Sequence, residues 1–231
     1  MGVVWMATVA GIAGTCLGGV IAFLVGRRGE STARMLTVFA GGAMLAIAFF
    51  DLIPEAMVIG GLGLTAVGVV GGVIGIGLCS LLLDRVPNGG GLLLLIGIGL
   101  HNFPEGLAIG AGGAFDLRLG LVLAVLIMLH DIPEGLAVAV PLLEGGRSRW
   151  RVLGLMALCG APTALGGLVG LWLGQAGRTF TALSLALAGG AMIYMTFCEV
   201  LPHALQGGRR SAAAVGVAGV LFGLITVQIL A

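Results

Sequence analysis

The residues that could do chemistry in this chain lie in two near-identical motifs. HNFPEG recurs 29 residues later as HDIPEG, at residues 101–106 and 130–135. Residues four apart on a helix share a face, so His101 projects beside Glu105, and His130 projects beside Glu134. Two such faces brought together present two imidazoles and two carboxylates, a ligand set that suits Zn²⁺ or Fe²⁺.

A second cation position could form one residue further along each motif. Asn102 and Asp131 point about 100° around their helices from the two histidines. Both motifs lie within apolar runs, where each ionisable group costs about 2.5–3.5 kcal/mol on insertion scales. A metal centre explains why such groups occur twice at the same spacing. An interhelical hydrogen-bond clamp is the structural alternative.

The composition is that of an all-α polytopic membrane protein. Of the 231 residues, 59% are hydrophobic and 9% are charged, and the mean hydropathy is +1.18. No polar stretch is long enough for a soluble domain, so residues 1–231 are predicted to form one transmembrane domain in contact with the lipid bilayer. The sequence has no basic patch, and no nucleic-acid partner is expected.

Eight apolar runs of roughly 20 residues predict eight transmembrane helices. They cover about residues 3–26, 35–59, 61–83, 91–114, 119–143, 152–175, 179–205 and 212–230. Nine arginines fall in the odd-numbered loops between these spans and two in the even-numbered loops. Because positive residues concentrate on the cytoplasmic side, both termini are expected outside.

A second repeat relates the two ends of the chain. AGGAM at residues 40–44 recurs at residues 188–192, an offset of 148. After each copy an acid and a proline align: Asp51 with Glu199, and Pro54 with Pro202. Spans 2 and 7 run in opposite directions, as do spans 4 and 5. The pattern predicts a 3+2+3 inverted repeat, with spans 1–3 and 6–8 around spans 4 and 5, an architecture that many secondary transporters share.

Other classes of function find little support in the sequence. The chain has no HExxH, GxSxG or phosphate-loop motif, and its three histidines are too few for an intramembrane di-iron oxygenase. We therefore expect no enzyme and no catalytic cofactor. The four cysteines lack CxxC spacing and are interpreted as packing residues. Glycine pairs at small-xxx-small spacing favour packing within one bundle, with a homodimer interface as the alternative.

The paired HNFPEG and HDIPEG motifs on consecutive membrane helices resemble the ZIP (Zrt/Irt-like) family of divalent-metal transporters, and within it the compact prokaryotic GufA-like branch. The resemblance covers essentially the whole chain. It implies an integral protein of the plasma (inner) membrane of a prokaryote. It also agrees with the eight spans, the outside termini and the inverted repeat that the sequence predicts.

This resemblance implies a binuclear metal centre between spans 4 and 5. The first site would comprise His101, Glu105, His130, Glu134 and, from span 2, Met44. The second would comprise Asn102, Asp131 and the bridging Glu105 and Glu134. Glu199 matches an acidic position towards the cytoplasmic exit. Relatives often carry Glu-Pro on span 6 where this chain has Ala161-Pro162, so the second site is expected to be incomplete or differently occupied.

These observations predict transport of divalent cations into the cytoplasm. Zn²⁺ is the first candidate, and Fe²⁺, Mn²⁺ and Cd²⁺ are further ones. The metal would be bound as cargo and not as a catalyst. A metal-selective channel and a membrane metal sensor that use the same site are the alternatives. Saturable flux would favour a carrier, and binding without net flux would favour a sensor.

Overall fold

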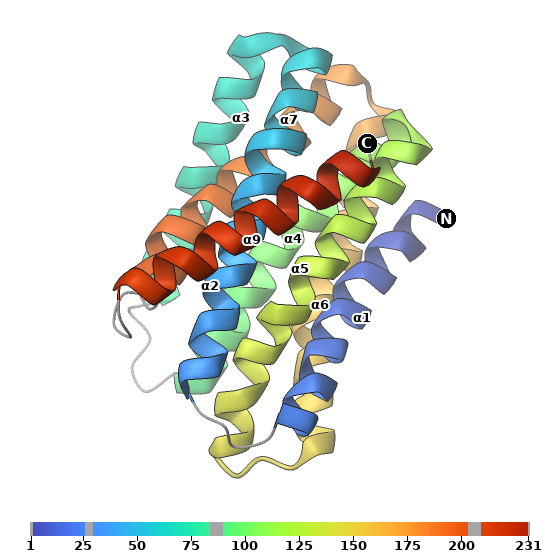
Figure 1. The fold of residues 1–231 in the computed structure, drawn as a ribbon. Helices are drawn as coiled ribbons and strands as arrows, with labels where there is room; N and C mark the ends of the chain where they lie inside the picture. Colours follow the sequence, from blue (N-terminus) through green and yellow to red (C-terminus); the bar gives the residue numbers. More distant parts are fainter. Residues whose placement is uncertain (1, 26–29, 84–89, 203–208, 231) are drawn as a thin grey trace.

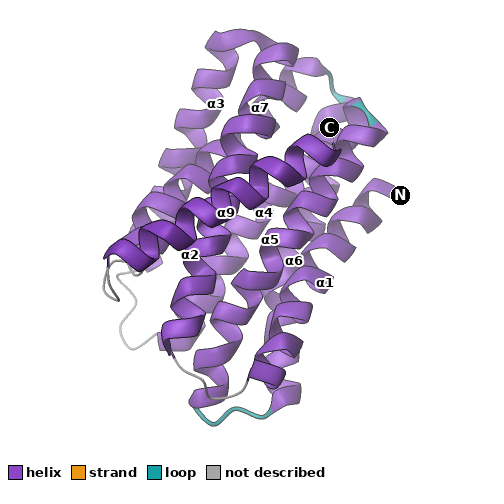
Figure 2. Cartoon of the chain, viewed as in Figure 1, coloured by secondary structure: helices purple, strands orange, loops and turns teal. Residues whose placement is uncertain are grey.

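A computed structural model gives the protein as long helices joined by short connections (Figure 1; Figure 2). The structure describes residues 2–25, 30–83, 90–202 and 209–230, and these contain no strand. The α-helices are α1 (Gly2–Val25), α2 (Glu30–Ile47), α3 (Ile53–Leu83), α4 (Gly90–Phe115), α5 (Leu117–Glu144), α6 (Arg149–Gln175), α7 (Arg178–Tyr194) and α9 (Arg209–Leu230). Two short π-helices, η1 (Ala48–Leu52) and η2 (Met195–Val200), follow α2 and α7.

Within the described ranges, six helical stretches are long and apolar enough to cross a membrane. The longest of them, Arg34–Leu82, runs through α2, η1 and α3. Its backbone leaves the helical conformation at Gly61, where φ is +77°, a conformation that glycine adopts at little steric cost. The predicted boundary between the second and third spans therefore coincides with a break in the helix. The all-helical membrane fold that the sequence predicts is confirmed.

A proline follows each π-helix after one intervening residue. Pro54 follows η1 in this way, and Pro202 follows η2. Proline has no N–H to donate to the carbonyl four residues earlier, and the residue before it bonds instead to the carbonyl five residues earlier. The two π-helices end at Leu52 and Val200, which are 148 residues apart, the offset of the AGGAM repeat.

Glycines allow backbone contact between the helices. A Cβ atom at Gly166 of α6 would collide with the carbonyl oxygen of Phe103 in α4, and one at Gly18 of α1 would collide with the carbonyl oxygen of Ile132 in α5. Gly166 follows Gly18 by 148 residues, and Ile132 follows Phe103 by 29. The contact of α1 with α5 is therefore repeated in the contact of α6 with α4. The two glycines are related by the 148-residue offset of the AGGAM repeat, and the two carbonyls by the 29-residue offset of the paired motifs. The spacing of these glycines serves packing within one chain.

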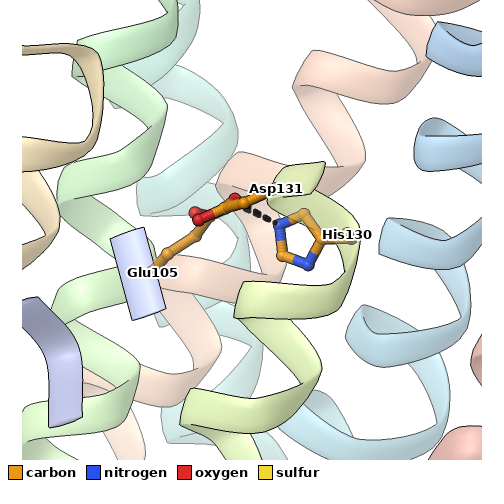
Figure 3. A group of neighbouring side chains, drawn as sticks. All are labelled: Glu105, His130 and Asp131. Atoms are coloured by element: carbon orange, nitrogen blue, oxygen red, sulfur yellow. Dashed lines mark hydrogen bonds and ion pairs between the residues drawn. The ribbon is translucent and has the colours of Figure 1, made fainter. Parts of the chain in front are cut away.

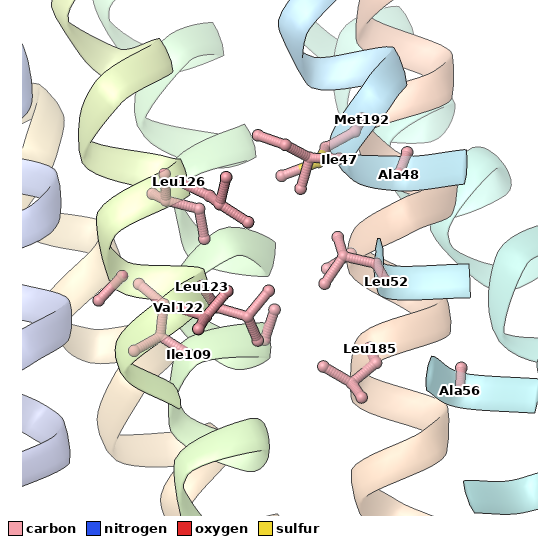
Figure 4. Close-up of a cluster of buried hydrophobic side chains, with 14 of the residues drawn as sticks. Ile47, Ala48, Leu52, Ala56, Ile109, Val122, Leu123, Leu126, Leu185 and Met192 are labelled. Atoms are coloured by element: carbon pink, nitrogen blue, oxygen red, sulfur yellow. The ribbon is translucent and has the colours of Figure 1, made fainter. Parts of the chain in front are cut away.

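An apolar core fills the space between α2, η1, α4, α5 and α7 (Figure 4). Its larger members are fully buried: Ile47 of α2, Leu52 of η1, Ile109 of α4, Leu123, Leu126 and Ile127 of α5, and Leu185 and Met192 of α7. Helix α9 lies against α2, and α3 lies against α7 (Figure 1). On the other side of the bundle, α1 and α6 pack against α5 and α4. Helices α4 and α5, which carry the two motifs, are thus covered by neighbours.

One hydroxyl group links two of these covering helices. Thr15 Oγ1 in α1 shares its proton between the carbonyl of Gly11, at 2.8 Å, and the carbonyl of Met156 in α6, at 3.0 Å. Thr15→Val should lower the free energy of unfolding by about 0.5–1.5 kcal/mol, because a buried interhelical hydrogen bond is lost. Thermal unfolding in detergent measures this. Thr8, which bonds only to Val4 of its own helix, is the matched control. An equal loss for Thr8→Val would contradict the interhelical role.

Candidate metal centre

The centre is formed where α4 packs against α5. Glu105 comes from α4, and His130 and Asp131 come from α5; the three side chains point towards one another (Figure 3). All three are at most 1% exposed to solvent. One potential ligand atom from each lies within 4.8 Å of the other two. This is a spacing that a single metal ion could bridge.

His130 is oriented by its own helix. Its Nδ1 lies 3.2 Å from the carbonyl oxygen of Leu126, one turn earlier. Nε2 lies within hydrogen-bond distance of Glu105 Oε1, at 2.9 Å, and 3.3 Å from Asp131 Oδ1. Because carbonyl and carboxylate oxygens both accept, one proton lies on Nδ1 and a second is shared between Nε2 and Glu105. A carbonyl contact at Nδ1 is the usual arrangement of a metal-binding histidine, and a metal ion bound at Nε2 would take the place of the second proton.

The two carboxyl groups have too few hydrogen-bond partners within the protein. Glu105 Oε2 and both carboxylate oxygens of Asp131 are buried and accept no hydrogen bond. Such groups are costly to bury as anions unless a cation or donors accompany them. A divalent cation would supply both charge and coordination. The donor set, one imidazole and two carboxylates, fits Zn²⁺, Fe²⁺ or Mn²⁺.

Asn102 connects the first motif to α6. Its Nδ2 donates to the carbonyl of Cys159 at 2.8 Å. Pro162, inside α6, lies three residues after Cys159, in the part of a helix where a proline frees nearby carbonyls. The Oδ1 atom of Asn102 is buried and has no hydrogen-bond partner. Ala161, which precedes Pro162, offers no donor atom.

The structure places the remaining predicted site residues as follows. Glu134 lies on α5, one turn after His130, and is partly buried. Met44 of α2 is 2% exposed and belongs to the apolar core cluster. His101 and Glu199 lie within α4 and η2, but their side chains are outside what the structure describes. Asp131, assigned by the sequence to a second site, lies beside His130, so the two predicted sites would adjoin.

Sequence reasoning passed over one polar residue close to this centre. Thr163 of α6 is fully buried, and its Oγ1 has no hydrogen-bond partner. Its backbone packs against Gly106, the residue after Glu105. Nothing in the local sequence distinguishes it from an ordinary packing threonine.

Comparisons with known proteins agree on the class of this helical membrane protein. Residues 84–231 match the ZIP zinc transporter family. The zinc transporter ZupT of Corynebacterium efficiens is 36% identical over 91% of this chain and 90% of the relative. ZupT of Akkermansia muciniphila is 32% identical over 94% of this chain and 93% of the relative.

A plant protein is also similar over part of its length. The zinc transporter ZTP29 of Arabidopsis thaliana is 41% identical over 58% of this chain and 48% of the relative. The chain is therefore an integral membrane protein of the ZIP zinc transporter family, whose members are transporters rather than enzymes.

Proposed function

We propose that this protein carries divalent metal ions, Zn²⁺ foremost, across the membrane into the cytoplasm. The buried group of Glu105, His130 and Asp131 is the observation that carries the proposal, because its ligand atoms lie within 4.8 Å of one another. Family membership and the zinc transporters among the relatives support the choice of cargo. Fe²⁺, Mn²⁺ and Cd²⁺ suit the same donors and are secondary candidates.

The proposed arrangement in the membrane is eight spans in a 3+2+3 inverted repeat. The break at Gly61 supports two spans within Arg34–Leu82, and the apolar sequence of α4 supports a further one. The paired glycine contacts of α1 with α5 and of α6 with α4 support the inverted repeat. The arginine distribution supports outside termini, and the bacterial relatives support the plasma membrane.

In this proposal the two motifs hold the ion near the middle of the bilayer. Glu105 and His130 bind it from facing helices, joined by His101, Glu134 and Met44. Asn102 and Asp131 line the adjoining second site, and Glu199 lies towards the cytoplasmic exit. These side chains replace the water that the ion loses on entering. Movement of one group of helices against the other would then open the site to the cytoplasm.

Uptake of ⁶⁵Zn²⁺ into proteoliposomes containing the purified protein tests this function. We expect saturable uptake with a strong temperature dependence, and faster flux when zinc is supplied from the side of the termini. Flux that does not saturate would favour the channel alternative. Tight zinc binding without any flux would favour a membrane sensor and would contradict transport.

A further inference from the structure

Three arginines and a tryptophan lie together where α5 ends and α6 begins. The side chains of Arg147, Arg149 and Arg151 are exposed, and that of Trp150 is 84% exposed. Within the part of the chain that the structure describes, no carboxylate forms an ion pair with any of the three guanidinium groups. Three positive charges within a few residues are therefore available to an anion from outside the protein.

The backbone gives the connection between α5 and α6 a defined shape. The N–H of Gly146 donates to the carbonyl of Leu143 at 3.0 Å, and the N–H of Arg147 donates to the carbonyl of Leu142 at 3.2 Å. Gly146 has a φ of +79°, the left-handed conformation with which glycine commonly ends a helix. Arg147 thus leaves α5 from a hydrogen-bonded turn, close in sequence to the arginines of α6.

The end of α1 positions one of the arginines. The guanidinium carbon of Arg149 lies 5.6 Å from the centroid of the Phe23 ring, and Phe23 itself packs against a buried cluster that includes Val152 and Met156 of α6. A guanidinium group held over an aromatic ring is attracted to the ring face. Its N–H groups lie in the guanidinium plane and remain able to grip two oxygens of one phosphate.

Two exposed tryptophans of α6 indicate the depth of these arginines in the membrane. Trp150 and Trp172, which is 69% exposed, are separated by about 33 Å at the rise of an α-helix. The hydrocarbon core of a bilayer is about 30 Å thick, and tryptophan prefers its two interfaces. Figure 1 shows the connection between α5 and α6 at the end of the bundle opposite to the N-terminus. The arginines beside Trp150 are therefore at the level of the lipid headgroups.

We propose that Phe23, Arg147, Arg149, Trp150 and Arg151 form a binding site for the headgroup of an anionic phospholipid. The arginines supply the charge that a phosphate requires, and the exposed Trp150 ring offers an apolar surface to the lipid chains, which a soluble phosphate lacks. This inference goes beyond metal transport and does not involve the centre between α4 and α5. With the termini outside, the site faces the cytoplasmic leaflet, where a bound lipid would join the ends of α1 and α6.

Lipid binding to the purified full-length protein tests this assignment. The protein in a neutral detergent is titrated with phosphatidylglycerol, and separately with phosphatidylcholine of the same acyl chains, and bound lipids are counted by native mass spectrometry. We expect phosphatidylglycerol to bind at least on the order of tenfold more tightly. Arg149→Gln should weaken its binding about fivefold, the contribution of one basic residue near an anionic lipid surface. Replacing all three arginines with glutamine should abolish the preference.

Arg178 provides the matched control. It is exposed at the start of α7, beyond the other end of α6, and its guanidinium carbon lies 5.4 Å from the centroid of the Phe115 ring. Arg178→Gln removes the same charge and the same kind of ring contact, and it should leave phosphatidylglycerol binding unchanged. Since Arg149 and Arg178 are both exposed, both variants should keep the wild-type melting temperature in detergent.

Four results would overturn the proposal. They are equal affinity of the wild-type protein for the two lipids, wild-type phosphatidylglycerol affinity in Arg149→Gln, an equal loss in Arg178→Gln, and displacement of the lipid by an equal concentration of glycerol phosphate. The last would assign the arginines to a soluble anion instead. None of these measurements involves zinc, so they are independent of whether the protein transports metal.

Discussion

Glu105→Gln is expected to reduce Zn²⁺ uptake at least on the order of 100-fold. Replacing a residue that only hydrogen-bonds to a metal ligand costs up to about 100-fold, and Glu105 would contact the metal itself. The substitution keeps the size of the side chain but removes one of the buried negative charges that face His130 Nε2. An amide oxygen binds a divalent cation more weakly than a carboxylate does. Uptake of ⁶⁵Zn²⁺ into proteoliposomes and equilibrium zinc binding in detergent measure the two consequences separately.

Asp116 supplies the matched acid outside the centre. It is exposed between α4 and α5, and its Oδ1 accepts the backbone N–H of Arg118 at 2.7 Å. Asp116→Asn keeps this acceptor and should retain wild-type uptake. If Glu105→Gln bound and transported zinc as Asp116→Asn does, the carboxylate of Glu105 would not be a ligand.

Gly166→Ala is expected to have a large effect on folding although it adds only one methyl group. The added Cβ would collide with the backbone of α4, at the carbonyl of Phe103 and the amide of Leu107. Backbone atoms cannot move aside as a flexible side chain can, so α4 and α6 must separate. We expect a loss of about 1–3 kcal/mol in the free energy of unfolding, the range for overpacked cores. Zinc affinity should fall as well, because α4 carries Glu105.

Gly71 is the matched control for this substitution. It lies on the outer face of α3, where an added Cβ would meet no atom within 4 Å. Gly71→Ala should leave zinc binding unchanged and should raise helix stability by up to about 1 kcal/mol, the helix-propensity difference. Thermal unfolding in detergent with and without Zn²⁺ measures both variants. Equal stability of the two would show that α4 and α6 do not need to pack at backbone contact.

The helical fold could be predicted because apolar runs of membrane-spanning length are a strong signal. The division near residue 60 could also be predicted, and Gly61 supplies its physical cause. The π-helices could not be predicted: Pro54 and Pro202 are visible in the sequence, but a proline can kink a helix, end it or widen it. Which of these occurs depends on how the neighbouring helices pack.

The grouping of Glu105 with His130 follows from the duplicated motif, since two similar faces on adjacent helices are expected to meet. The grouping of Asp131 with Glu105 of α4 and His130 could not be predicted, because spacing along one helix does not tell how closely α4 approaches α5. The same limit applies to Asn102, which donates to the carbonyl of Cys159. The two residues are 57 positions apart and lie on different helices, so neither local sequence reveals their contact.

Zinc K-edge absorption fine structure on the protein loaded with one equivalent of Zn²⁺ most directly tests whether the paired motifs hold the metal. The expected first shell contains imidazole nitrogen and carboxylate oxygen at about 2.0–2.2 Å. His130→Ala should weaken the imidazole contribution and Glu105→Gln should alter the oxygen shell. A spectrum unchanged by both substitutions, or one dominated by sulfur at about 2.3 Å, would place the zinc elsewhere and contradict a metal centre between α4 and α5.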